Sequence, residues 1–317
     1  MSKRKKKEIA EQKEEIVQKE FNSIEEDINT RKNKFNKKFR TYKVVNIVLI
    51  IVSIIVITLC YILLFPIGTN GMWATFIIIA VLIIAIFIYS VYMKRSITKK
   101  ADKYMNEYYE LTSNYVFSFD GIEDYQIAQH EKMSLEDFKD ARLIKDVYRT
   151  GSRNLVSYKL NNFNYKVSDY IAYRLNNEVS EPMFLGKLMY IDLEKSINGR
   201  ILIYRHPDKK SLDVGGPDDK DDLTKTYSSE KLDVYVSDEK LAKIVTEEAI
   251  KVLEEIQTGV NLADITVSII DTRITIAMAY GDEIMVVPLK RPFDFDSLEQ
   301  YKENINAVHT FVNSLSL

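Results

Sequence analysis

Residues that could do chemistry are few and scattered in this sequence of 317 residues. The three histidines, His130, His206 and His309, have no spacing that could hold a metal ion, and His309 falls beside the apolar stripe of an expected final helix, which favours a helix-surface position. The single cysteine, Cys60, excludes an internal disulfide and a cysteine-based zinc site. Neither a glycine-rich phosphate loop nor a Gly-x-Ser-x-Gly or His-Glu-x-x-His motif occurs. Sequence motifs therefore predict no catalytic, cofactor-binding or metal-binding residue.

One group of carboxylates could hold a cation. Residues 213–222 carry five aspartates around Gly215-Gly216-Pro217, namely Asp213, Asp218, Asp219, Asp221 and Asp222. Oxygen-rich loops bind calcium, but this spacing differs from that of an EF-hand loop. We favour a solvated acidic loop and leave cation binding open.

A site could also be assembled from dispersed polar residues, because active sites are recognised by geometry rather than by a motif. Residues 165–175 alternate between apolar and polar types at a period of two, which predicts a strand. Asp169, Tyr173 and Arg174 on this strand are the candidates for such a site.

A run of fifty residues, Val44 to Met93, carries no charge and separates the N-terminal segment from the rest of the chain. Two apolar segments of 22 residues, 44–65 and 72–93, flank a turn at 66–71 that contains proline and glycine. As helices, each would be roughly 33 Å long, enough to cross a hydrocarbon core of about 30 Å. The run predicts a transmembrane helical hairpin rather than a pair of buried helices.

Basic residues flank both spans, and the turn between them carries no charge. Since positive flanks stay in the cytoplasm, both termini are expected inside a bacterial cell membrane, with residues 66–71 outside. No Asp, Glu, Lys, Arg or His lies within either span. Ion and proton pathways usually contain such groups, so the spans are interpreted as anchors in the lipid bilayer.

Two cytosolic helices are expected next to the spans. Residues 1–43 hold fourteen basic and eight acidic residues and one apolar helical stripe, and residues 94–116 carry an a/d seam from Ile97 to Tyr115. The two stripes can pair within one chain as a stalk, or pack on the cytosolic domain or on a second copy. The basic start, Met1 to Lys7, could bind anionic lipid, although a solvated tail is favoured.

Residues 117–317 predict a cytosolic α+β domain in which helices cover an antiparallel sheet. The charge after Met93 is −8, which argues against nucleic-acid binding. Asn198-Gly199 is typical of a tight hairpin turn between strands 183–192 and 200–205. The other expected elements are helices at 134–141, 237–257 and 296–315 and strands at 143–148, 232–236, 265–270, 274–280 and 284–289.

The stretch from about Asp146 to Leu317 resembles a bacterial family of two-span membrane proteins known as a domain of unknown function. The residues that carry the resemblance are Asp169, Phe184-Leu185-Gly186-Lys187-Leu188, Ile191-Asp192, Asn198-Gly199-Arg200, Leu232 to Asp238 and the hairpin around Asp271. The resemblance implies no established activity. It implies an association with LemA-type membrane proteins.

Three hypotheses for the function follow, the third being binding of anionic lipid by the basic N-terminus. The first is a membrane-tethered interaction module that binds a protein partner through its cytosolic domain. The second is a membrane-bound enzyme with a site around Asp169, Tyr173 and Arg174. A pocket with convergent polar groups would favour the enzyme, and a flat or grooved apolar surface would favour the module. The sequence leaves the oligomeric state open.

Overall fold

The computed structural model describes residues 3–64, 68–144, 146–176, 178–205, 222–256, 262–280 and 295–317. The chain divides into two compact units. Unit 1 comprises Met1–Tyr108 and Val287–Phe293, and unit 2 comprises Tyr109–Val286 and Asp294–Leu317.

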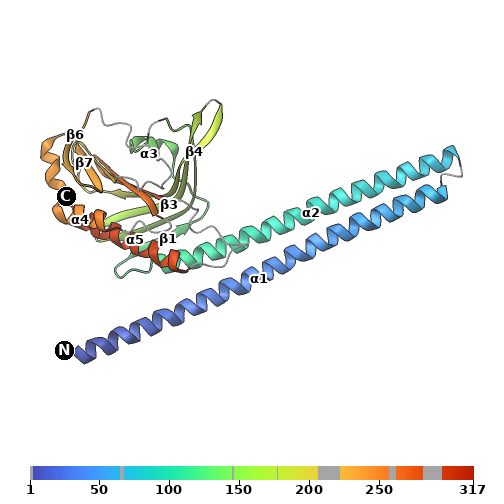
Figure 1. Ribbon diagram of the computed structural model, residues 1–317, viewed down its shortest axis with the longest axis horizontal. Helices are drawn as coiled ribbons and strands as arrows, with labels where there is room; N and C mark the ends of the chain where they lie inside the picture. The colour runs from blue at the N-terminus through green and yellow to red at the C-terminus, as the bar shows by residue number, and fades with distance from the viewer. Residues whose placement is uncertain are drawn as a thin grey trace. The chain divides into compact units, whose positions relative to one another are not determined.

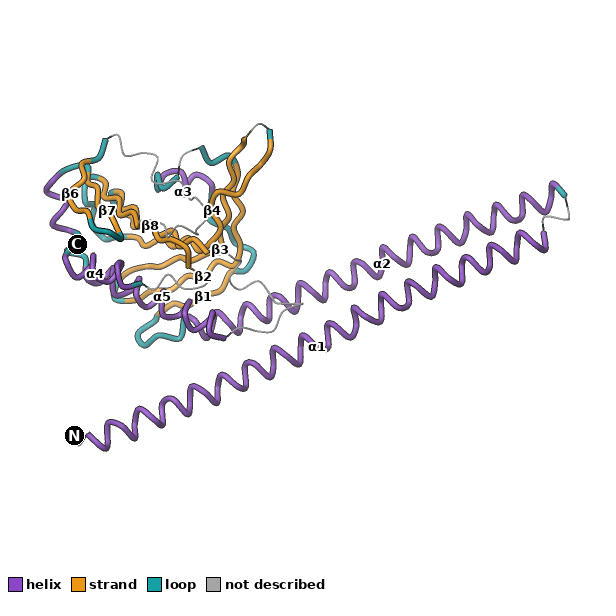
Figure 2. The backbone as a smooth tube through the Cα atoms, in the orientation of Figure 1, coloured by secondary structure: helices purple, strands orange, loops and turns teal. Residues whose placement is uncertain are grey.

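Unit 1 contains two long helices, α1 (Lys3–Leu64) and the first part of α2 (Thr69–Val116). Figure 2 shows them as antiparallel helices. Both are long and apolar enough to cross a membrane. Apolar side chains such as those of Ile54, Phe76 and Phe87 are more than half exposed. By length and composition, both helices are therefore candidate membrane spans.

Outside the apolar segments, the two helices contact each other through aromatic and charged side chains. The ring of Phe35 on α1 stacks on that of Tyr104 on α2, with 6.1 Å between centroids. Arg31 donates hydrogen bonds to Asp27 on its own helix and to Glu107 on α2. The two apolar stripes therefore meet within one chain, as one of the sequence-based alternatives expected.

Unit 2 is built around an antiparallel sheet in which, over the described residues, nine strands have the order β1-β2-β3-β4-β9-β8-β5-β7-β6. The strands are β1 (Glu123–Ala128), β2 (Arg149–Leu160), β3 (Phe163–Asn176), β4 (Val179–Asp192), β5 (Arg200–Arg205), β6 (Thr224–Ser228), β7 (Leu232–Val236), β8 (Leu262–Ile270) and β9 (Arg273–Tyr280). The helices of this unit are the end of α2, α3 (Leu135–Asp140), the 3₁₀ helix η2 (Glu239–Ile244), α4 (Glu247–Glu255) and α5 (Phe295–Ser314). The α+β class is confirmed.

Helices cover both faces of this sheet (Figure 1). On one face, Phe138 of α3 stacks on Tyr170 of β3 with centroids 4.9 Å apart. On the other face, α5 buries Tyr301 and Phe311, and Leu253 of α4 is buried as well. Because both faces are covered, the central strands carry apolar residues on both sides.

Several predicted elements are confirmed. Ser134 caps α3 by accepting a hydrogen bond from the backbone N–H of Asp137. The strands predicted at 165–175, 232–236, 265–270 and 274–280 correspond to β3, β7, β8 and β9, and the final predicted helix corresponds to α5. Asp271 forms the turn between β8 and β9 with a φ of 49°.

Three predictions about elements are wrong. The described residues of 143–148 are not in a strand: Leu143, Ile144 and Val147 are apolar because they are buried in one core cluster with Phe138 of α3. Residues 237–257 are not one helix, because Thr246 caps α4 after a separate turn of η2. The third error concerns the Asn198-Gly199 turn.

Asn198-Gly199 does not join a hairpin, although Asn198 takes the expected positive φ of 52°. Strand β4 pairs with β9, and β5 pairs with β8 and β7. The connection instead packs on the β8–β9 turn, where the N–H of Ile197 donates to the carbonyl of Asp271 and the N–H of Asp271 donates to that of Gly199. The predicted strand at 284–289 lies outside the described residues.

Candidate functional site

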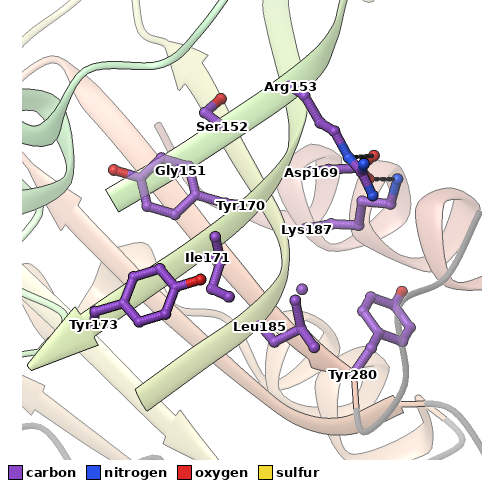
Figure 3. A pocket seen from close by; sticks show the side chains of 11 residues that line it. Gly151, Ser152, Arg153, Asp169, Tyr170, Ile171, Tyr173, Leu185, Lys187 and Tyr280 are labelled. Carbon is purple, nitrogen blue, oxygen red and sulfur yellow. Dashed lines mark hydrogen bonds and ion pairs between the residues drawn. The ribbon is translucent and has the colours of Figure 1, made fainter. Parts of the chain in front are cut away.

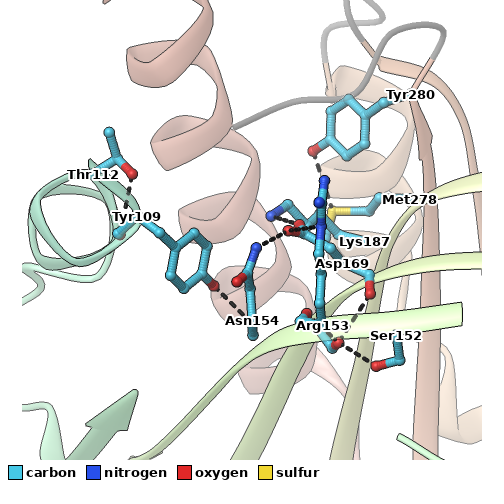
Figure 4. A network of polar contacts seen from close by, with 10 residues as sticks. Tyr109, Thr112, Ser152, Arg153, Asn154, Asp169, Lys187, Met278 and Tyr280 are labelled. Atoms are coloured by element: carbon cyan, nitrogen blue, oxygen red, sulfur yellow. Dashed lines mark hydrogen bonds and ion pairs between the residues drawn. The ribbon is translucent and has the colours of Figure 1, made fainter. Parts of the chain in front are cut away.

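Three charged residues from neighbouring strands form a row across the sheet. In the strand register, Arg153 of β2 lies opposite Asp169 of β3, and Asp169 lies opposite Lys187 of β4. Residues paired in register on adjacent strands point to the same face, so the three side chains meet on the face that α5 covers. Figure 4 shows this polar cluster.

The carboxylate of Asp169 is held by its neighbours. Lys187 donates to Oδ1 of Asp169, and Nδ2 of Asn154 donates to Oδ2 over 2.6 Å. Nε of Arg153 lies 3.8 Å from the same Oδ2. The side chain of Lys187 is 3% exposed and that of Asp169 is 14% exposed. A buried ion pair tolerates desolvation only when further hydrogen bonds satisfy it, and Asn154 supplies one.

A β-bulge directs Asn154 toward this carboxylate. The register between β2 and β3 shifts between Arg153 and Val156, and Asn154 takes a φ of 59°. Its backbone carbonyl accepts a hydrogen bond of 2.7 Å from the hydroxyl of Tyr109 at the end of α2 (Figure 4). Bulges are often found beside functional sites because they re-aim a side chain.

A cavity of about 270 Å³ lies next to the row. Figure 3 shows Ile171, Leu185 and Tyr280 around it, with the Asp169 cluster near one end and Tyr173 near the other. Gly151 of β2 lies opposite Ile171, and the absence of a side chain there leaves space beside Ile171. The cavity thus combines apolar walls with charged groups at one end.

Tyrosines near the cluster stay protonated. The Nζ of Lys187 lies 5.0 Å from the ring centre of Tyr301. Burial raises the pKa of Tyr301 and of Tyr109 well above the usual value of 10.0. Both phenols are therefore neutral at physiological pH and are not bases, and Tyr109 donates its hydroxyl proton to the carbonyl of Asn154.

The position predicted for His309 is wrong. His309 is 4% exposed, and its Nε2 forms a hydrogen bond of 2.7 Å with the hydroxyl of Tyr158. The rings of Tyr158 and Tyr165 enclose it. Burial lowers its pKa from 6.5 to about 4, so the imidazole is neutral at physiological pH.

The structure brings together two of the three candidate site residues. Asp169 and Tyr173 line the cavity. Arg174 lies near the tip of the β3–β4 hairpin and pairs with Glu181 over 3.3 Å, with both side chains exposed. The alternation of β3 explains this, since Arg174 points to the face opposite that of Asp169 and Tyr173.

Sequence reasoning missed Arg153, Asn154 and Lys187. Lys187 carried a usable signal, because it sits in β4 between apolar residues on both faces, and a lysine buried in such a strand needs a partner. Among the residues the structure describes, no group of three His, Cys, Asp or Glu side chains could hold a metal ion. His206 and all the clustered aspartates except Asp222 lie outside these residues.

Comparisons with known proteins show similarity to two families that have no assigned function. Residues 9–139 match the family of unknown function DUF5392, and residues 182–317 match the protein of unknown function DUF3137. No curated protein matches the chain. A solved structure, the crystal structure of the mycobacterial trehalose monomycolate transport factor A, TtfA, aligns with a TM-score of 0.31 at 8% identity, over 64% of this chain and 94% of that one. The expected resemblance to an uncharacterised family is confirmed, and no activity follows from it.

Proposed function

We propose that this protein is a two-span membrane protein that tethers a cytoplasmic α+β recognition domain. The observation that carries the proposal is the charge-free run from Val44 to Met93, whose described residues lie in two helices with many apolar side chains about half exposed or more. Without lipid, each exposed apolar side chain would face water at a cost of roughly 1.5–3 kcal/mol. Membrane insertion removes that cost.

The basic flanks support an orientation with both termini in the cytoplasm. Arg40 and Lys43 come before the first apolar segment, and Lys94 and Arg95 follow the second. Positively charged flanks are retained on the cytoplasmic side. The cell membrane is the proposed location, and unit 2 lies in the cytoplasm.

The state of Asp169 favours recognition over catalysis. Both of its carboxylate oxygens already accept hydrogen bonds, from Lys187 and from Asn154. A general base must be able to reach a substrate proton, and this carboxylate is committed to a structural ion pair. The alternative, an enzyme that uses Asp169 and Tyr173, requires that pair to open.

The proposed partner of the domain is a second membrane protein, and the family resemblance suggests one of the LemA type. A further alternative is binding of anionic lipid by the basic segment at Lys3 to Lys7. Under that alternative, replacing these five basic residues with glutamine abolishes the binding of anionic lipid. Under the proposal, the replacement leaves partner capture intact.

Cysteine labelling tests the topology. Thr69→Cys in a Cys60→Ser background is expected to react with an impermeant maleimide on intact cells. Ser2→Cys and Ser316→Cys are expected to react only after the cells are lysed. Labelling of either terminus on intact cells would overturn the proposed orientation.

Cross-linking in native membranes tests the recognition role. The full chain is expected to capture one membrane protein at a constant ratio. A chain truncated after Lys103 retains both spans but lacks unit 2, and it is expected to lose that protein. Equal capture by the truncated chain would assign the interaction to the membrane helices and contradict the proposal.

A further inference from the structure

Strand β2 presents two arginines and a glycine to the same face of the sheet. Arg149, Gly151 and Arg153 are alternate residues, and they lie opposite Tyr173, Ile171 and Asp169 of β3. At about 3.3 Å per residue, the two arginine Cα atoms are roughly 13 Å apart. The glycine between them leaves the cavity open where a side chain would otherwise fill it.

The space between the arginines fits a small apolar body. Ile171 and Leu185 are aliphatic, and Tyr173 and Tyr280 add aromatic rings. The volume of about 270 Å³ could hold about nine water molecules at roughly 30 Å³ each. This is the size of a small organic molecule rather than of a helix or a folded partner.

The charge that a ligand meets in this cavity is positive. The side chain of Arg153 is 46% exposed, and the row of Arg153, Asp169 and Lys187 carries two positive charges and one negative charge. The guanidinium of Arg149 covers the ring of Tyr173, 4.6 Å from its centroid, next to the other end of the cavity. A guanidinium binds carboxylate through two parallel N–H bonds and is less strongly hydrated than an ammonium group.

We infer that this cavity binds a small amphipathic carboxylate, with its head group at Arg153 and its apolar body on Ile171 and Leu185. The inference rests on the proposed recognition role of unit 2 and gives that role a chemical class of ligand. The polar row then has two functions: Lys187 and Arg153 both pair with Asp169, and the partly exposed guanidinium of Arg153 also meets the ligand's anion. The same chemistry occurs in free organic acids and in anionic lipid head groups, which the experiment separates.

Calorimetry on the full chain in phosphatidylcholine nanodiscs tests this inference, with empty nanodiscs as the blank. The probe is hydrocinnamate, which has a phenyl body and a carboxylate, and the matched neutral probe is hydrocinnamamide. Saturable binding of hydrocinnamate is expected, and the amide is expected to bind about tenfold more weakly or worse because it cannot pair with a guanidinium. Equal binding of the two probes, or none, would overturn the inference.

Four variants locate the site. Arg153→Gln is expected to weaken hydrocinnamate about tenfold, and Ile171→Trp is expected to abolish binding by filling the cavity. Arg174→Gln and Leu175→Trp are the matched controls, because both positions lie on the same strand but at the exposed hairpin tip, and both are expected to bind as the wild type does. If Ile171→Trp does not fold, Leu185→Trp takes its place. Unchanged binding in the cavity variants would place the ligand elsewhere and contradict the inference.

A lipid arm distinguishes the two sources of anion. In nanodiscs that contain phosphatidylglycerol, a free organic acid is expected to bind unchanged. Competition by the lipid would assign the cavity to a head group and overturn the assignment to a free carboxylate. The topology labelling and the partner cross-linking do not depend on this cavity, so failure here would leave the proposed function standing.

Discussion

The ion pair between Asp169 and Lys187 lies in the protein interior, where an unpaired charge has a high desolvation cost. Lys187 is almost fully buried, and its strand neighbours Leu188 and Met189 are completely buried. Removing one partner of such a pair leaves an unmatched charge, whereas removing both leaves an apolar contact. The two changes therefore have different consequences.

Lys187→Met is expected to destabilise unit 2 by roughly 3–5 kcal/mol, since Asp169 would lose its main counter-charge. Urea pulse proteolysis of the full chain in nanodiscs measures this difference. The double variant Asp169→Leu/Lys187→Met is expected to be more stable than Lys187→Met alone. A double variant less stable than the single one would show that the carboxylate stabilises the fold in its own right.

His309 makes the stability of unit 2 depend on pH. Burial lowers its pKa in the folded chain to about 4, whereas the unfolded chain binds that proton near pH 6.5. Between these values the unfolded state holds more protons, so stability falls as the pH falls, by up to roughly 3 kcal/mol across the window. Above pH 6.5 both states are neutral at this residue, and it contributes no pH dependence.

The histidine contribution can be isolated by substitution. In His309→Gln, the urea midpoint is expected to change less between pH 7 and pH 4.5 than it does in the wild type, because the histidine no longer titrates. Some change remains, because the carboxylates titrate in both proteins. The measurement is the difference between the two pH profiles. Parallel profiles would show that the pKa of His309 is the same in the folded and unfolded chain.

At the scale of single residues, the sequence located part of the site. Strand periodicity placed Asp169 on a face shared with Tyr173, and the structure agrees. Asn154 could not be found in this way, because its orientation depends on a one-residue bulge against β3. Burial of His309 depends on Tyr158 and Tyr165, which are about 150 residues away in the sequence. Contacts between distant segments leave no local pattern.

Among the elements, β4 and β9 approach each other closely at Gly186. A Cβ atom at Gly186 would lie 1.9 Å from the carbonyl oxygen of Met278, closer than any real contact. Backbone atoms of a paired strand cannot move away without breaking the ladder. Gly186 therefore allows the two halves of the sheet to join.

Gly186→Ala is expected to destabilise unit 2 by roughly 3 kcal/mol, near the upper end of the usual cost of overpacking. Gly151→Ala is the matched control, because its Cβ would meet only the Cγ2 of Ile171, at 3.0 Å, and that side chain can shift. The urea midpoints of the two variants give the comparison. Equal midpoints would mean that β9 can shift to accommodate a methyl group.

Elements were predictable where one face of a helix or strand packs on the core and gives a regular apolar period. They were not predictable where apolar residues are buried without such a period. Strand β3 and helix α5 show a clear period and were found. The described residues of 143–148 are not in a strand, since Leu143 and Ile144 are buried in one core cluster with Phe138 of α3. Asn198-Gly199 correctly predicted a positive φ but not the pairing, because the backbone of a turn does not determine which strands lie side by side.

At the scale of the whole molecule, the last turns of α2 belong to the α+β unit. Tyr109, Thr112, Ser113 and Val116 are buried, and unit 2 begins at Tyr109, eight residues before the boundary at Phe117 that the sequence suggested. Tyr109 also anchors the bulge through the carbonyl of Asn154.

A soluble fragment 109–317 is therefore expected to melt cooperatively, and fragment 117–317 is expected to melt at least roughly 6 °C lower. The loss of one buried aromatic residue costs about 3–5 kcal/mol, and each kcal/mol shifts the midpoint of a domain of this size by about 2–4 °C. Fragment 94–317 is the control and should match fragment 109–317. Identical midpoints for all three would show that the end of α2 contributes nothing to unit 2.

The strand order has a consequence during synthesis. Strands β1 to β4 can pair as soon as they leave the ribosome, but β4 must wait for β9, whose first residue, Arg273, comes 81 positions after Asp192. At 5–20 residues per second, the apolar outer edge of β4 stays unpaired for roughly 4–16 s. An open edge of this kind is a template for association with other chains. On the proposed topology the two anchors have by then already emerged, so each nascent domain would wait at the membrane surface, apart from other unfinished chains.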